Sequence, residues 1–216
     1  MHGMTARSPW SVASLGATAL MWTVMMAAMM LPSALPMLRV VAATNREIVA
    51  VRRPVALTAL VATGYLIAWL GFSLVATTLQ AQLQAMSLLS PTLALVNARL
   101  GGAVLVLAGI YQFTGVKGAC LSRCRSPFSL LLHDWRPGLG GSLRMGIAQG
   151  LACVGCCAAL MLVLFVVGVM NWPWVMLLAV IVFVEKTGRG GPVFSRMVGG
   201  GLVVAGAAAL LSLGPR

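Results

Sequence analysis

Charged side chains are scarce in this chain of 216 residues: Asp, Glu, Lys and Arg make up 8% of it, and only three residues are acidic. About a quarter of the residues of a soluble domain are charged, so this composition excludes an ordinary soluble domain. Hydrophobic residues make up 60% of the chain. Lipid offers no hydrogen-bond partner to the backbone, so an apolar chain must cross it as helices or as a closed barrel. Long apolar runs favour an all-α fold class, a polytopic transmembrane helical bundle.

Several functional motifs are also absent. The chain has no Gly-x-x-x-x-Gly-Lys-Ser/Thr phosphate loop, which argues against an ATP-driven pump, and no convincing Ser-His-Asp arrangement. Although the net charge is +12, the basic residues form no run interleaved with aromatics, so we expect no nucleic-acid partner. The first ten residues lack the features of a signal peptide, and we expect no cleavage there. An enzymatic role is the less favoured interpretation.

The apolar runs predict a single integral membrane domain over residues 1–216 with about six helices. Their approximate bounds are 12–38, 55–79, 100–116, 145–170, 172–184 and 198–213. Pro32 and Pro36 predict that the first helix kinks or ends, because proline removes a backbone donor. We expect the 80–99 connection to form an interfacial helix or a short lid, and the loop from Lys117 to Arg144, which is rich in proline and glycine, to be irregular.

The basic residues alternate between connections. Three connections hold twelve of the fifteen: Arg39, Arg46, Arg52 and Arg53; Lys117, Arg123, Arg125, Arg136 and Arg144; Lys186, Arg189 and Arg196. The other segments hold one each, at Arg7, Arg99 and Arg216. This is the positive-inside pattern. It predicts a multi-pass protein of the inner (cytoplasmic) membrane with both termini outside and the three basic loops in the cytoplasm.

The first apolar run is rich in methionine. At 100° per residue, Met21, Met25 and Met29 form one stripe along a helix, and Met26 and Met30 form an adjacent stripe. Thioethers are soft neutral ligands that suit Cu(I), so stacked methionines offer a path for such an ion. Methionine is also a flexible apolar filler that suits packing or contact with lipid.

The fourth apolar run carries three cysteines. Cys153, Cys156 and Cys157 have i, i+3, i+4 spacing, which places three sulfurs on one helix face, with Met161 one turn further on. Convergent thiols make a trigonal thiolate site for a soft metal, and a pair binds Cu(I) almost linearly or exchanges as a disulfide. Free cysteine also packs as a small hydrophobe at helix contacts.

A second pair of cysteines, Cys120 and Cys124, lies in the third connection, with His133 further on. The neighbouring basic residues favour thiolate over thiol, and the pair suggests a cytoplasmic point of metal transfer. The same basic residues have a simpler explanation as topology signals. Five cysteines in this arrangement are not a secreted disulfide framework, so we expect reduced thiols.

Four polar residues interrupt or close apolar runs. Glu185 and Lys186 close the fifth run, where an interfacial ion pair and a functional role are both open. Tyr111 and Gln112 interrupt the third run, where hydrogen bonding between helices is the simpler explanation and ligand binding the alternative.

These pieces together resemble a bacterial family of predicted metal-binding integral membrane proteins, a domain of unknown function sometimes described as copper-chaperone-like. The residues that carry the resemblance are Trp22 to Pro32, Gly64, Tyr65, Trp69, Tyr111, Gln112, Lys117, Cys120, Cys124, Arg125, Pro127, Cys156, Cys157, Met161, Gly168 to Asn171, Glu185 and Lys186. The resemblance implies metal binding and a role like that of a copper chaperone.

Three functions are open at this point. The first is binding or translocation of a soft metal, most plausibly Cu(I), through the candidate ligands Met21, Met25, Met26, Met29, Met30, Cys120, Cys124, Cys153, Cys156, Cys157 and Met161. The second is a non-catalytic assembly or scaffold subunit of a larger membrane complex, and the third is a membrane thiol oxidoreductase. The expected partners are the lipid bilayer and either a metal-donor or metal-acceptor protein or a larger membrane complex.

Overall fold

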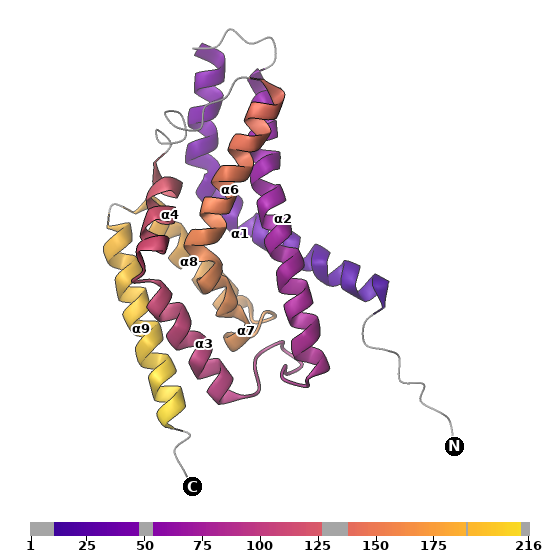
Figure 1. Cartoon of the computed structure of the whole chain (residues 1–216), viewed down its shortest axis with the longest axis vertical. Helices are drawn as coiled ribbons and strands as arrows, with labels where there is room; N and C mark the ends of the chain where they lie inside the picture. Colours follow the sequence, from indigo (N-terminus) through magenta and orange to yellow (C-terminus); the bar gives the residue numbers. More distant parts are fainter. Residues whose placement is uncertain (1–10, 48–53, 127–137, 189, 213–216) are drawn as a thin grey trace.

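The fold is all-helical in the computed structural model, which describes residues 11–47, 54–126, 138–188 and 190–212. The helices are α1 (Val12–Glu47), α2 (Pro54–Ala85), α3 (Ala98–Tyr111), α4 (Gly115–Arg125), α6 (Leu139–Leu162), α7 (Leu164–Val167), α8 (Trp172–Thr187) and α9 (Gly191–Leu211). Figure 1 shows them as an elongated bundle. Within the described residues the extended structure is limited to one isolated bridge, between Leu89 and Leu95.

The all-α fold class is confirmed for the described residues. Four helical stretches, Val12–Arg46, Val55–Ala85, Leu139–Val167 and Gly191–Leu211, are long and apolar enough to cross a membrane. A fifth is present if α3 and α4, which meet at a bend of 64°, form one span. The remaining predicted segment is α8, which has 16 residues. Many large apolar side chains are exposed on the bundle, including Val204 and Leu107, as expected of a surface that faces lipid.

The long helices differ in reach. At 1.5 Å per residue, α9 is about 32 Å long, close to the thickness of a bilayer core, whereas α1 is about 54 Å long. The prolines do not end α1, which contains both Pro32 and Pro36, but its course is bent in Figure 1, as expected where proline removes backbone hydrogen bonds. The described ends of α1, α2, α4, α6, α8 and α9 that border the basic connections lie in the upper part of Figure 1.

Glycine permits two close helix pairs. A Cβ on Gly146 of α6 would overlap the carbonyl oxygen of Val61 on α2, and one on Gly64 would overlap that of Leu143. Between α3 and α9, a Cβ on Gly109 would lie 2.7 Å from the carbonyl oxygen of Gly199. The two backbones of each pair therefore approach closely only because a side chain is missing on one of them.

Two predictions about the connections need correction. The prediction of an irregular loop after Lys117 is wrong for Gly115–Arg125, because the Thr114 side chain caps this segment and starts α4; Pro127, His133, Asp134 and Pro137 lie outside the described residues. The 80–99 connection does not form a separate helix. Its first residues continue α2, and the buried Gln80 accepts a 2.8 Å hydrogen bond from the Trp22 indole.

Candidate metal centre

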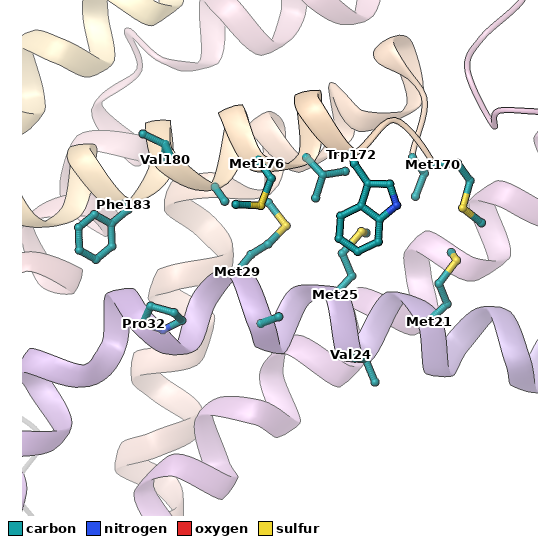
Figure 2. Close-up of a pocket in the computed structure, with 14 residues that line it drawn as sticks. Met21, Val24, Met25, Met29, Pro32, Met170, Trp172, Met176, Val180 and Phe183 are labelled. Carbon is teal, nitrogen blue, oxygen red and sulfur yellow. The ribbon is translucent and has the colours of Figure 1, made fainter.

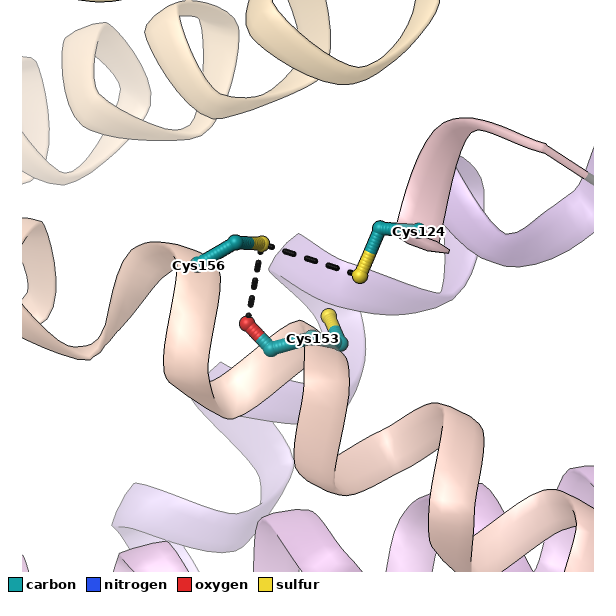
Figure 3. A group of neighbouring side chains, drawn as sticks. All are labelled: Cys124, Cys153 and Cys156. Carbon is teal, nitrogen blue, oxygen red and sulfur yellow. Dashed lines mark hydrogen bonds between the residues drawn. The ribbon is translucent and has the colours of Figure 1, made fainter. Parts of the chain in front are cut away.

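Three thiols from two helices converge in the interior of the bundle. The Sγ atoms of Cys124 on α4 and of Cys153 and Cys156 on α6 all lie within 4.8 Å of one another (Figure 3). The Cys156 and Cys124 sulfurs are 3.7 Å apart. Cys153 and Cys156 are buried, Cys124 is partly buried, and all three are free thiols.

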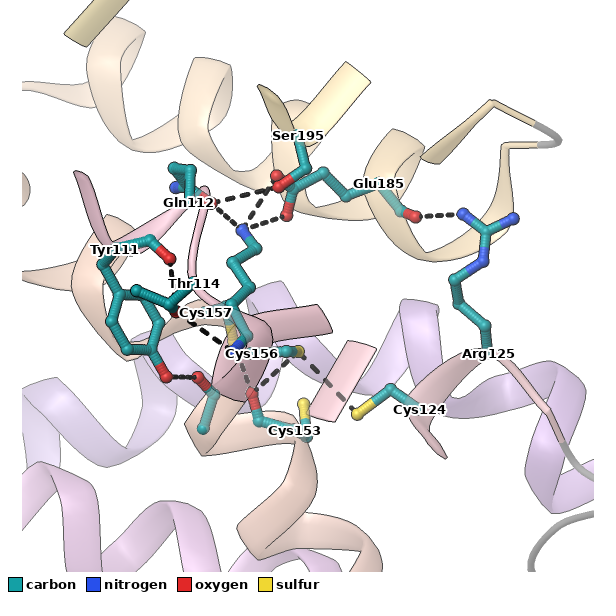
Figure 4. A network of polar contacts seen from close by, with 12 residues as sticks. Tyr111, Gln112, Thr114, Cys124, Arg125, Cys153, Cys156, Cys157, Glu185 and Ser195 are labelled. Carbon is teal, nitrogen blue, oxygen red and sulfur yellow. Dashed lines mark hydrogen bonds and ion pairs between the residues drawn. The ribbon is translucent and has the colours of Figure 1, made fainter. Parts of the chain in front are cut away.

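Arg125 joins α4 to the end of α8. The Arg125 guanidinium donates to the backbone carbonyl of Glu185 in the last turn of α8 at 2.6 Å (Figure 4) and to that of its C-cap Gly188 at 2.5 Å. A cation at a helix C-terminus also interacts favourably with the helix dipole. These bonds hold the C-terminal turn of α4, which carries Cys124, against the end of α8.

A buried ion pair adds to the same junction. The Lys117 ammonium lies 2.9 and 3.0 Å from the two Glu185 oxygens, and both side chains are 1% exposed. Lys117 also donates to the side-chain oxygen of Gln112, which accepts from Ser195 of α9 at 3.2 Å. Glu185 therefore pairs with Lys117. Tyr111 donates to the Gly155 carbonyl at 2.6 Å, so Tyr111 and Gln112 both bond between helices, as the sequence indicated.

Lys186 lies against the thiol cluster. Its ammonium is 2.8 Å from the Cys153 sulfur, 3.3 Å from the Ser33 hydroxyl and 3.5 Å from the Met30 sulfur. The Tyr65 hydroxyl is 2.9 Å from the same Cys153 sulfur. Lys186 is buried, with only 8% of its surface exposed. Among the side chains that the structure describes, it nevertheless forms no ion pair with a carboxylate. A buried ammonium needs an anionic partner, and the group in position to supply one is the Cys153 sulfur.

A small cavity adjoins these groups. It measures about 10 Å³, room for about one water molecule or one ion, and its lining includes Cys124, Cys153, Tyr65, Lys186 and Gln149. The Gln149 side-chain oxygen is buried and has no hydrogen-bond partner among the described residues. The cavity therefore offers an unused acceptor beside two of the three thiols.

The other predicted cysteine ligands stand at the edge of this cluster. Cys157 is fully buried, donates to the Cys153 carbonyl at 2.8 Å, and has its sulfur 4.0 Å from the Met30 sulfur. Cys120 lies against Gly155, one turn of α4 before Cys124. Met161 and Met26 are fully buried in the apolar core, and neither lines the small cavity.

The methionine stripes separate as the helical spacing predicts. Met21, Met25 and Met29 line an open apolar groove of about 570 Å³ between α1 and α8 (Figure 2). Met26 and Met30 point into the core. Met170 and Met176 complete the groove from the other side; they were missed as candidates because nothing in the sequence places α8 against α1. On α1, Met29 lines the groove, and the next residue, Met30, contacts Cys157 and Lys186 beside the thiol cluster.

The donor set of the cluster fits a soft metal. With metal–sulfur bonds of about 2.3 Å, three sulfurs around a trigonal ion stand about 4.0 Å apart, near the spacing of the three thiols. Thiolate and thioether ligands select Cu(I) and zinc over hard cations such as magnesium. The arrangement can hold such an ion, or allow two of the thiols to oxidise to a disulfide after a small movement.

Comparison with protein families identifies the family of this chain. No curated protein and no solved structure matches the chain. Residues 19–209, which include all five cysteines, match the PpoB2 family, described as copper chaperones. The chain belongs to this copper chaperone family.

Proposed function

We propose that the protein binds Cu(I) as cargo in the membrane through the thiolates of Cys124, Cys153 and Cys156. The observation that carries the proposal is the convergence of these three sulfurs, from two separate helices, to within 4.8 Å of one another. Family membership supports copper as the metal. Cu(I) prefers soft ligands, and three thiolates bind it far better than the water and carbonyl oxygens that would compete.

Lys186 completes this site electrostatically. A Cu(I) ion with three thiolates carries a net charge of −2, which is costly in a buried position without a cation. The Lys186 ammonium, 2.8 Å from the Cys153 sulfur, offsets part of this charge. Each thiol that becomes a ligand gives up its proton, so binding releases protons to the solvent.

The methionines form the route to this site in our proposal. Met21, Met25 and Met29 line the groove with Met170 and Met176, and neutral thioethers bind Cu(I) without losing a proton. Met30 links the groove to the thiols, because its sulfur lies 4.0 Å from Cys157 and 3.5 Å from Lys186. An ion would move from weaker neutral ligands to stronger anionic ones.

Cys120 is the proposed point of transfer to a cytoplasmic acceptor. It lies one helical turn from Cys124 on α4 and is only partly buried, so an acceptor protein can reach it. This direction follows from the proposed topology, in which the basic connections face the cytoplasm and both termini lie outside. In this topology the six spans are α1, α2, the bent pair α3 and α4, α6 with α7, α8, and α9. The shortest of them is α8, with 16 residues.

The test is Cu(I) affinity and stoichiometry, measured on detergent-solubilised protein under anaerobic reducing conditions in competition with a chromophoric chelator. Wild type should bind one Cu(I) tightly. The triple variant Cys124/Cys153/Cys156→Ser should lose this ion, whereas Cys157→Ser, a matched change on the same helix, should retain it. Both variants place a hydroxyl of similar size where each thiol stood, so packing is preserved.

The alternatives give different outcomes. A scaffold subunit would show no tight Cu(I) binding in wild type. A thiol oxidoreductase would show reversible oxidation of Cys124 and Cys156, whose sulfurs are 3.7 Å apart, with a change in thiol titre between redox states and no copper requirement. Either result would contradict the proposal.

A further inference from the structure

A polar pocket lies on the other side of α4, away from the thiols. It measures about 450 Å³, and its lining comes from the α3–α4 bend, from α4 and from the first turns of α9. Its lining side chains include Arg125, Arg196, Ser122 and Gln112. None of the thiols of the metal centre lines it, so it is a separate site.

The charge in this pocket is positive. None of the described residues that line it carries a carboxylate, and the charge of Lys117, which does line it, is offset by Glu185. The Arg125 guanidinium donates to two backbone carbonyls, which are uncharged and leave its positive charge in place. Arg196 is exposed. Arg125 and Arg196 therefore line one pocket that has no carboxylate among the described residues of its lining, and guanidinium is the side-chain group best suited to bind phosphate.

A buried donor in the lining lacks a partner. Gln112 is 4% exposed, its side-chain oxygen accepts from Lys117 and Ser195, and its side-chain nitrogen has no partner among the described residues. Burying an amide donor without an acceptor is unfavourable. An anion in the pocket would supply that acceptor.

The start of α4 adds backbone donors. Gly115 and Gly118 line the pocket, and a Cβ at either position would meet no atom within 4 Å. The first turn of α4 is therefore open to a ligand, and the N-terminus of a helix of 11 residues carries partial positive charge and free N–H groups.

We propose that this pocket binds a phosphate group, most directly that of an anionic phospholipid. The pocket lies at the N-terminal end of α9, which is about one bilayer core in length, so it stands at the level of the lipid headgroups. Basic pockets between helices on the cytoplasmic side bind such headgroups. Free inorganic phosphate has the same chemistry and is the alternative source.

Native mass spectrometry of the purified chain tests the proposal. The protein is delipidated in detergent and titrated with phosphatidylglycerol or phosphatidylcholine, with and without inorganic phosphate. Wild type should retain the anionic lipid over the zwitterionic one. Arg196→Gln should weaken its retention about fivefold, the effect of about one basic side chain near a headgroup, and Ser122→Glu should weaken it further by charge repulsion. Arg99→Gln, at the far end of α3, is the matched control and should change nothing.

The outcomes separate the sources. Loss of phosphatidylglycerol on addition of millimolar phosphate, together with phosphate adducts that Arg196→Gln removes, would support the site with a free anion as its ligand. Insensitivity to phosphate, with the expected variant effects, would support the lipid. Equal retention of the two lipids by wild type, or wild-type retention by both pocket variants, would overturn the proposal. The Cu(I) affinity of each variant, expected to match wild type, verifies that the fold is intact.

Discussion

The thiol cluster and the methionine groove are the two sulfur-rich regions of the molecule, and they differ in their surroundings. Two polar side chains, Lys186 and Tyr65, contact the Cys153 sulfur of the cluster, and a buried ion pair and Arg125 join α4, which carries Cys124, to α8. The groove has almost entirely apolar walls and is open at its surface. Anionic ligands with a nearby cation suit retention of an ion, and neutral ligands in an open groove suit its passage. The following predictions test this contrast.

The largest expected effect is on the frame of the cluster. Glu185→Gln leaves the Lys117 ammonium buried without an anion, and breaking one partner of a buried ion pair costs about 3–5 kcal/mol. We expect this loss in unfolding free energy, measured in mixed micelles. Replacing both partners, as Lys117→Met with Glu185→Leu, should restore most of it. Equal stability of Glu185→Gln and wild type would contradict the role given to the pair.

The stability of the protein should depend on close helix packing at α6, which carries two of the clustered thiols. It should not depend on packing at the start of α1. Gly146→Ala places a methyl group against the Val61 backbone, and overpacking of this kind costs about 1–3 kcal/mol. Gly16→Ala meets open space and should leave the melting temperature unchanged or slightly raised. Thermal unfolding of both variants checks this, and a similar shift in the two would remove the distinction.

Lys186→Leu separates electrostatics from packing at the cluster. It removes the cation beside Cys153 while retaining an apolar side chain. We expect Cu(I) affinity to fall by at least about tenfold, because a hydrogen bond to a charged group contributes about 1.5–3 kcal/mol. Lys186→Arg should recover part of the affinity. Chelator competition gives both values, and unchanged affinity in Lys186→Leu would show that the ammonium contributes nothing to metal binding.

The smallest expected effect is in the groove. A triple substitution by Leu, at Met25, Met29 and Met176, keeps nearly the same side-chain volume but removes three thioethers. We expect the equilibrium affinity for the tightly bound ion to stay as in wild type and the rate of loading, followed by stopped-flow spectroscopy, to fall severalfold. A loss of affinity would place the tight site in the groove and reverse the contrast.

The sequence predicts most of the helices because their apolar runs are long and their composition leaves few alternatives. It also places Cys153 and Cys156 on one face of a helix. It does not predict that Cys124 joins them, because the segment from Lys117 onward reads as a loop, whereas the Thr114 cap starts a helix there.

Cys157 shows the limit of a helical-face argument. Three sulfurs on an arc of about 100° do not all face the same neighbour. Here α4 contributes its thiol beside Cys153 and Cys156, and Cys157 turns toward Met30. The sequence marks Lys186 as a residue with a possible functional role but does not place it beside Cys153, because that position depends on how α8 packs against α1 and α6.

X-ray absorption spectroscopy at the copper edge of the Cu(I)-loaded protein tests the central claim most directly. Wild type should show three sulfur neighbours at about 2.3 Å and Cys124→Ser two, because that substitution removes the ligand that α4 supplies. An identical sulfur count and spectrum in wild type and Cys124→Ser would contradict the account, since the ion would then be bound without Cys124.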